Sequence, residues 1–223
     1  MVIDNFEIFR KHLTFETKQD RYIVHVLRRP KDVKHLGNEL GSNECQRLLR
    51  TYYIDSLDYF DKKIPAIKEL CKSNRARAYI IPQVRNNEEC LLNLAEKVLE
   101  TIRLKNYSVK PEHLLRAAYC EYHKSRKKVW ILDLDNDEMH GWTVEQVFEL
   151  VKSQLKVIGK DESEAYLVQT KSGMHILTSP FNLQKAYKLC PMLYEGVHKD
   201  SNGENVVGWL HKDGMSLLYL DLD

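Results

Sequence analysis

The sequence lacks long hydrophobic runs and a signal-like start. Its 223 residues contain no apolar stretch of about 18 residues, the length that a membrane-spanning helix needs, so no membrane span is expected. Residues 1–5 (MVIDN) show no basic-then-apolar signal pattern. The cytoplasm is therefore the expected location, which means the host cytoplasm if a phage encodes the protein.

Closely spaced cysteine pairs and an excess of one charge are also absent. The five cysteines form no C-x-x-C pair and are odd in number, which predicts free thiols in a reducing compartment and no structural zinc site. Lys and Arg (34) nearly balance Asp and Glu (32), leaving a formal charge of +2. This balance gives no global signal for nucleic-acid binding, so any site for a polyanion must be a local patch.

The first half of the chain combines strand-like and helix-like segments. Residues 21–29 (RYIVHVLRR) and 78–84 (AYIIPQV) are rich in Val, Ile and Tyr and predict two strands, the second at an edge or with a bulge because of Pro82. Between them, Ser42 or Asn43 is expected to cap a long helical region. Glycine (9) and proline (6) are scarce, which predicts short linkers.

From Asn86 onward, helix-like and strand-like segments alternate along the sequence. Helix starts are expected at Asn86, Pro111, Thr143 and Asn182, and strands at residues 129–135, 165–169 and 174–178. Residues 206–211 and 217–222 are expected to form a terminal hairpin joined by Asp213-Gly214, a strong turn signal. The order of elements predicts an α+β fold with helices on one face of a mainly antiparallel sheet. We expect an N-terminal α/β module at 1–125 and a second module at 126–223.

An acidic pair ends the strand at residues 129–135 (VWILDLD). Successive strand side chains point to opposite faces, so Asp133 and Asp135 share a face, with Cα atoms roughly 6.5 Å apart. Two carboxylates at that spacing can hold one Mg²⁺ or Mn²⁺, or bridge two metals about 3.5–4 Å apart. The alternative is an acidic strand end that only solvates a turn.

A Ser-Gly-His loop lies between the strands at 165–169 and 174–178. Gly173 permits a tight turn that exposes backbone amides. Together with Lys171, Ser172 and His175, these amides form a candidate anion cradle for phosphates. The alternative is an ordinary hairpin turn followed by a histidine with a backbone partner.

At these residues the sequence resembles the archaeo-eukaryotic primase superfamily, which includes primase-polymerases. The apolar strand ending in Asp-x-Asp matches the family's first motif, and residues 172–175 (SGMH) match its Ser-x-His type motif. The resemblance covers roughly Val129 to Tyr219. It implies a two-module core, with an N-terminal α/β module followed by an antiparallel sheet of RNA-recognition-motif type with helices on one face. It also implies that Asp133 and Asp135 bind Mg²⁺ or Mn²⁺ and that His175 contacts the triphosphate of an incoming nucleotide.

The family's third motif has no clear match. It places an aspartate at the start of a later strand, where this sequence reads VGWLHKD at 207–213. Asp213 is the expected substitute as third metal ligand, with Asp200 and Asp221 as alternatives. His211 and Lys212 lie where the family often contacts phosphate.

The resemblance implies a nucleotidyltransferase that joins nucleoside triphosphates on a DNA or RNA template, with other replication or transcription proteins as further candidate partners. Arg28, Arg29, Arg77 and Arg85 are candidate contacts to the nucleic-acid backbone. One alternative is a non-catalytic protein with a primase-like fold that binds nucleic acid or a replication or transcription partner. Another is a phosphohydrolase of the haloacid dehalogenase type, although Asp137 stands where that family has Thr or Val.

Overall fold

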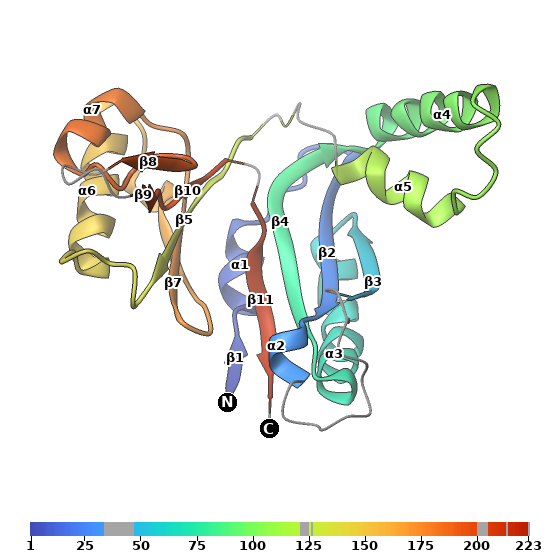
Figure 1. Cartoon of the computed structure of the whole chain (residues 1–223), viewed down its shortest axis with the longest axis horizontal. Coiled ribbons are helices and arrows are strands. Elements are labelled where there is room, and N and C mark those ends of the chain that lie inside the picture. Colours follow the sequence, from blue (N-terminus) through green and yellow to red (C-terminus); the bar gives the residue numbers. More distant parts are fainter. Residues whose placement is uncertain (34–46, 121–124, 126, 200–204, 213, 223) are drawn as a thin grey trace.

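The computed structural model describes residues 1–33, 47–120, 125, 127–199, 205–212 and 214–222 (Figure 1). Within them the chain forms an α+β fold with two larger antiparallel sheets. A small antiparallel ribbon pairs β8 (Val197–Lys199) with β9 (Asn205–Val207). The predicted α+β class is therefore confirmed.

The larger sheet is built mainly from the first half of the chain. Its strand order is β1-β11-β4-β2-β3, and every neighbouring pair runs antiparallel. The strands are β1 (Val2–Asp4), β2 (Asp20–Arg28), β3 (Arg47–Ile54), β4 (Arg77–Asn86) and β11 (Ser216–Asp221). One face of this sheet packs against α1 (Phe6–His12) and α3 (Leu57–Asn74) through Phe6, Phe9, Phe60 and Ile67.

The long helical region expected after Ser42 or Asn43 is wrong in its first part. Both proposed caps lie outside the described residues, and residues 47–54 form strand β3 instead of a helix. This segment (RLLRTYYI) pairs along nearly its whole length with β2, and its Thr, Tyr and Ile residues also favour a strand. The helix begins later, at α3, where the Ser56 side chain accepts a hydrogen bond from the backbone N–H of Tyr59.

Strand β4 lies between β11 and β2, so of the two settings expected for Pro82, an edge or a bulge, the edge does not apply. The predicted bulge is present. The pairing of β4 with β2 shifts between Arg21–Arg85 and Ile23–Ile81, which leaves Pro82 within the irregular stretch. A central strand tolerates proline here because the missing N–H falls where the ladder is already interrupted.

The smaller sheet contains the strands that carry the sequence motifs. Its order is β10-β5-β7-β6, again antiparallel throughout. The strands are β5 (Trp130–Asp135), β6 (Tyr166–Gln169), β7 (Gly173–Thr178) and β10 (Leu210–His211). The outer face packs against α6 (Val144–Val157) and α7 (Leu183–Leu189), which Thr143 and Asn182 cap as expected; a 3-10 turn, η2 (Glu162–Glu164), precedes β6.

Alternation along β5 decides which residues face the larger sheet. Leu132 and Leu134 pack with α6 and α7 in one core cluster, whereas Ile131 joins the cluster that contains α1, α3 and the larger sheet. Asp133 and Asp135 therefore lie on the same side as Ile131, toward the larger sheet. The strand is buried on both faces, so only its acidic end meets solvent.

The predicted hairpin of residues 206–211 and 217–222 is wrong. Strand β10 pairs with β5, whereas β11 lies between β1 and β4 in the other sheet. Leu218 and Leu220 of β11 are fully buried, because this strand has neighbours on both edges and packing on both faces. The larger sheet thus includes a strand from 126–223, and the division into modules at 125 and 126 remains a prediction.

Two further helices form a hairpin that leaves the body of the protein. These are α4 (Asn87–Arg103), capped by the Asn86 side chain, and α5 (Pro111–Cys120), and both begin where the sequence predicts. The short helix α2 (Pro30–Val33) follows β2. Figure 1 shows α4 and α5 at the end of the molecule opposite to α6 and α7. Among the described residues, no helix combines the length and the apolar character needed to cross a bilayer.

Asn5 joins the two sheets. This buried side chain donates through Nδ2 to the carbonyl oxygens of Gln169, at the end of β6, and Leu217, in β11, at 2.9 Å each. Removing the amide leaves the buried Leu217 carbonyl and the partly buried Gln169 carbonyl without this donor, which costs about 1–3 kcal/mol. We expect Asn5→Ala to lower the free energy of unfolding by that amount in urea titrations.

Asn106→Ala provides the matched control, because Asn106 is exposed in the loop between α4 and α5. This variant is expected to change the free energy of unfolding by less than about 0.5 kcal/mol. An Asn5→Ala protein as stable as the control would show that the link between the sheets contributes nothing.

Candidate functional site

A cavity of about 260 Å³ lies between the two sheets at the acidic end of β5. Polar and charged side chains from both sheets line it: Arg29, Arg77, Tyr79, Asp133, Asp135, Thr170, Lys171, Ser172, His175 and His211. Most of the site residues predicted from the sequence therefore meet in one place. The strand pairing explains this, because Asp133 is the direct neighbour of His175, and Asp135 of Gly173, across β5 and β7.

His175 is held from both sides. Its Nε2 lies 3.1 Å from Oδ1 of Asp133, and its Nδ1 lies 2.9 Å from Oγ of Ser216, a fully buried residue of β11. In the neutral ring, an Nε2–H that donates to Asp133 leaves Nδ1 to accept from the Ser216 hydroxyl. The two contacts fix the orientation of the imidazole between the sheets, on the same side as the acids.

The turn before β7 fits closely against the end of β5. The Ser172 hydroxyl donates to Oδ1 of Asp135 at 2.5 Å, and the Thr170 hydroxyl accepts from the backbone N–H of Gly173 at 3.0 Å. A Cβ atom at Gly173 would lie 2.0 Å from the Leu134 carbonyl oxygen, so no larger residue fits there without moving the backbone. Glycine is therefore required by close approach of the two strands.

A buried ion cluster forms another wall of the cavity. Asp32, in α2, accepts two hydrogen bonds from Arg77 of β4, at 2.6 and 2.5 Å, and one from Lys171 at 2.9 Å. Because Lys171 lies in the turn between β6 and β7 of the smaller sheet, the cluster joins the two sheets. Burial would raise the pKa of the Asp32 carboxyl, but the hydrogen bonds and charges of Arg77 and Lys171 lower it overall.

The electrostatics of Asp133 favour the ionised carboxylate. Burial by itself would raise its pKa, whereas the hydrogen bond and charge of His175 lower it. The charges of His211 and Arg29 act in the same direction, so the pKa of Asp133 lies below its ordinary value. A charged acid that faces cations within a confined cavity is suited to bind a metal ion together with an anionic ligand.

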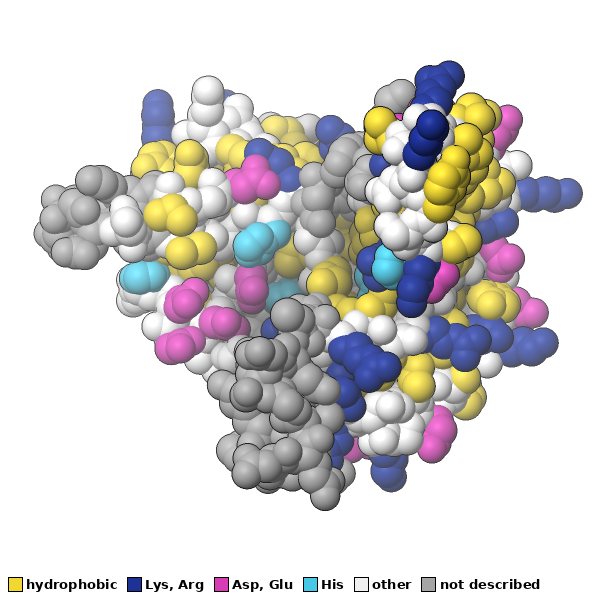
Figure 2. Space-filling view, turned by 45° about the vertical axis from the view of Figure 1, so that its right-hand side comes forward, with side chains coloured by type: hydrophobic (Ala, Val, Ile, Leu, Met, Phe, Trp, Pro, Cys, Tyr) yellow, Lys and Arg dark blue, Asp and Glu magenta, His cyan; other side chains and the backbone are white. Residues whose placement is uncertain are grey.

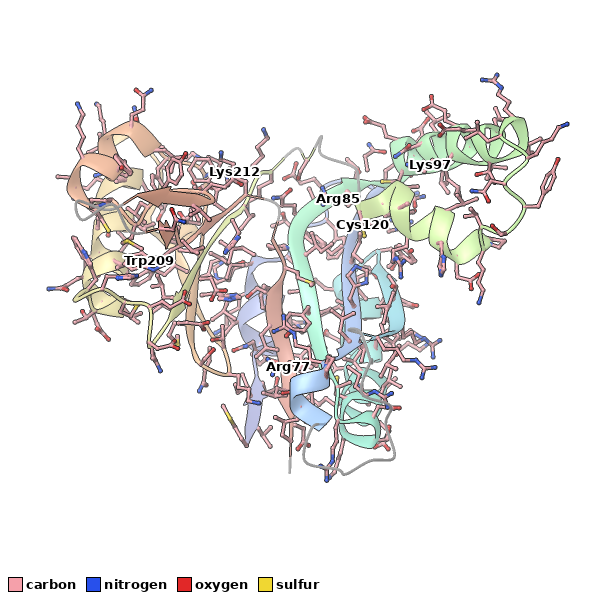
Figure 3. The ribbon with its side chains drawn as sticks, in the orientation of Figure 1. Arg77, Arg85, Lys97, Cys120, Trp209 and Lys212 are labelled. Carbon is pink, nitrogen blue, oxygen red and sulfur yellow. The ribbon has the colours of Figure 1, made fainter. Side chains whose placement is uncertain are left out.

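The basic residues predicted as contacts lie in different environments. Arg29 lines the cavity with its guanidinium 5.2 Å from the centre of the Tyr79 ring, and His211 lines it from β10. Lys212 forms an ion pair with Glu195 at 2.5 Å and lines a different groove, beside α7. Figure 3 shows the guanidiniums of Arg77 and Arg85 near opposite ends of β4.

Burial corrects the expected role of two arginines. Arg77 and Arg85 are 4% and 2% exposed, so neither offers an open contact for a nucleic-acid backbone. Arg77 instead holds Asp32, because a buried charge requires a partner. Arg28 is half-buried at the end of β2 and does not line the cavity.

The two carboxylates of the cavity suit a metal ion that is also coordinated by a bound ligand. Asp133 and Asp135 face the same cavity, and Mg²⁺ is typically bound by one or two carboxylates together with substrate phosphates. Within the described residues there is no group of three or more His, Cys, Asp or Glu side chains arranged around a metal position. Asp213, the expected third ligand, lies outside the described residues, as does Asp200. Asp221, at the far end of β11, does not line the cavity.

Asp32 and Ser216, which bond the cavity residues Lys171 and His175, are not predicted from the sequence. Asp32 follows Arg28 and Arg29 in a basic stretch that gives no acid-site signal. Ser216 is an ordinary serine beside a predicted turn. Both are brought to the site by pairing of strands distant in sequence, which no local pattern reports.

No family model, no curated protein and no solved structure matches the chain. The fold and the cavity therefore define an α+β protein with an acid–histidine site between two antiparallel sheets, and its function has to be argued from that site.

Asp32→Asn tests the buried ion cluster. Loss of this carboxylate leaves Arg77 buried without a counter-charge, which should lower the free energy of unfolding at pH 7 by about 3–5 kcal/mol. Because the pKa of Asp32 in the folded protein lies below its ordinary value of 3.8, its contribution is present above that pH and is lost as the pH falls through the folded-state value. The difference between wild type and variant should therefore shrink in acid, as measured by urea unfolding across this pH range.

Glu149→Gln is the control, since Glu149 forms an exposed ion pair with Lys152. We expect it to cost less than about 0.5 kcal/mol. Equal, small losses for both variants would mean that the Asp32 cluster does not support the cavity.

Proposed function

We propose that the protein is a metal-dependent nucleotidyltransferase of the primase-polymerase type, which joins nucleotides on a DNA or RNA template, taking them from nucleoside triphosphates with release of pyrophosphate. One observation carries the proposal: Asp133, Asp135 and His175 face a single cavity, with the imidazole on the same side of the sheet as the acids. An imidazole on the opposite face would have ended this interpretation.

The basic side chains of the cavity support a phosphate ligand. Arg29, Lys171 and His211 reach it from three separate segments of the chain. The Nε atom of Arg29 is buried and, among the described residues, has no hydrogen-bond partner. Since an unpaired buried donor is costly, an anionic oxygen from a ligand would stabilise it.

The residues in and beside the cavity have distinct roles in this proposal. Asp133 and Asp135 would hold Mg²⁺ or Mn²⁺ in the cavity, and the bound metal would stabilise the negative charge that develops in phosphoryl transfer. His175, oriented by Ser216, directs its ring toward the Asp133 side of the cavity, where it contacts the triphosphate. Ser172 holds Asp135 in place, and Gly173 lets the turn come close enough for that bond.

A second candidate is a primase-like protein that binds nucleic acid or a replication or transcription partner without catalysis. One observation favours it: among the described residues, Asp133 and Asp135 are the only acids that line the cavity, and Asp32 beside it is already paired with Arg77 and Lys171. Two-metal catalysis needs ligands for both ions. Binding without synthesis would then rest on the basic side chains around the cavity.

Asp133→Asn and Asp135→Asn test the first proposal. With Mn²⁺, labelled nucleotide and a primed template, each variant should incorporate nucleotide at least about 100-fold more slowly, because the metal supplies several kcal/mol of transition-state stabilisation and about 1.4 kcal/mol is tenfold in rate. Asp137→Asn is the matched control, since Asp137 is an exposed acid two residues further on and does not line the cavity. Wild-type rates in the Asp133→Asn protein would refute the proposal.

Binding measurements separate the two candidates. If the wild type binds a labelled strand but incorporates nothing, and this binding survives both substitutions, the protein is a binding module. If binding and incorporation are both absent over a range of templates, neither candidate stands.

A further inference from the structure

Helix α4 exposes a row of large apolar side chains. Leu91, Leu92, Val98, Leu99 and Ile102 are all exposed, and Leu92 and Leu99 are 62% and 54% accessible to solvent. Within α4 only Cys90 is buried. Figure 2 shows hydrophobic side chains gathered on this hairpin, at the upper right, with Lys and Arg side chains beside them. A contiguous exposed apolar face of this kind marks an interaction site.

The exposed residues follow the repeat of a coiled coil. Leu92, Ala95, Leu99 and Ile102 are spaced by three, four and three residues, as positions a, d, a and d of two heptads. Helix α5 packs on another side of α4, where Cys90 is buried and the Asn93 side chain donates to the Ala118 carbonyl oxygen. The a/d face therefore points away from α5, and the described part of the chain leaves it open.

We infer that this face binds the same face of a second copy of the chain, with the two α4 helices antiparallel. The distribution of charge along α4 favours a second copy of the chain as the partner and an antiparallel orientation. Its first turn is acidic, with Glu88 and Glu89, and its last turn carries Arg103, followed by Lys105. In an antiparallel pair the acidic start of one helix lies against the basic end of the other, whereas a parallel pair would place like charges together.

The heptad positions give the register. Leu92 of one copy packs against Ile102 of the second copy, and Ala95 against Leu99, so four apolar layers form around the dyad. Position e then places Glu89 beside Arg103 of the second copy, twice by symmetry. The same arrangement places Glu96 beside its own copy at the centre, which is one repulsive contact in an otherwise complementary interface.

This interface leaves the cavity accessible. Figure 1 shows α4 at the far end of the molecule from β5 and β7, which carry Asp133 and His175. Dimerisation therefore does not depend on the proposed enzymatic function.

Sedimentation velocity on the full chain over a range of concentrations tests the inference. The wild type should be a concentration-dependent dimer, and Leu99→Glu should raise the dissociation constant by more than about tenfold, because it places a charge in an apolar layer. Leu189→Glu, on α7, is the matched control, since Leu189 is 56% exposed and lies on a different surface. Circular dichroism checks that each variant keeps its helix content.

Charge variants test the register. Glu96→Gln removes the central repulsion and should tighten the dimer about threefold or more, whereas Glu100→Gln, outside the seam, should not. Glu89→Arg should weaken the dimer, and adding Arg103→Glu should restore it. A monomeric wild type at high concentration would overturn the inference, as would a dimer that Leu99→Glu leaves intact. A Glu96→Gln protein that dimerises no better than wild type, or failure of the double variant to recover, would overturn the antiparallel register.

Discussion

Hydrogen bonds between polar side chains buried at the contact hold the two sheets together. Asn5 bonds carbonyl oxygens of both sheets, His175 of the smaller sheet bonds Ser216 of the larger, and Lys171 of the smaller bonds Asp32 beside the larger. Gln83 of β4 adds bonds to the backbone of Val129 and Lys212. Such groups would be costly if left unpaired, so the sheets have one favoured arrangement in which all these bonds form together.

This pairing also shapes the candidate site. The bonds around His175 and Asp32 that hold the sheets together line the cavity, so the groups that bind a ligand in our proposal are oriented by the contacts that stabilise the fold. Rigid support of this kind is what a site for metal and phosphate requires. The α4–α5 hairpin is different: it lies away from this contact, it exposes apolar surface, and its role in assembly is independent of the cavity.

Local sequence patterns predicted most of the helix starts and the three strands β5, β6 and β7 of the smaller sheet. The caps at Asn86, Thr143 and Asn182 were found because their side chains bond amides three residues away. Strands β5, β6 and β7 were found because alternation and β-branched residues act locally. The partners of β11 were predicted wrongly, because strand pairing joins residues that are far apart in the sequence. The error at β3 was a local one, since residues 51–54 (TYYI) favour a strand.

The sequence by itself determined that Asp133 and Asp135 share a face and that Gly173 permits a turn, because both follow from backbone geometry over a few residues. Only the tertiary structure decided that Ser216 and Asp32 support the site and that Arg77 and Arg85 are buried. It also decided that β11 belongs to the larger sheet. These outcomes depend on which distant segments share a core, and the free energy of that choice comes from burial and pairing summed over the whole chain.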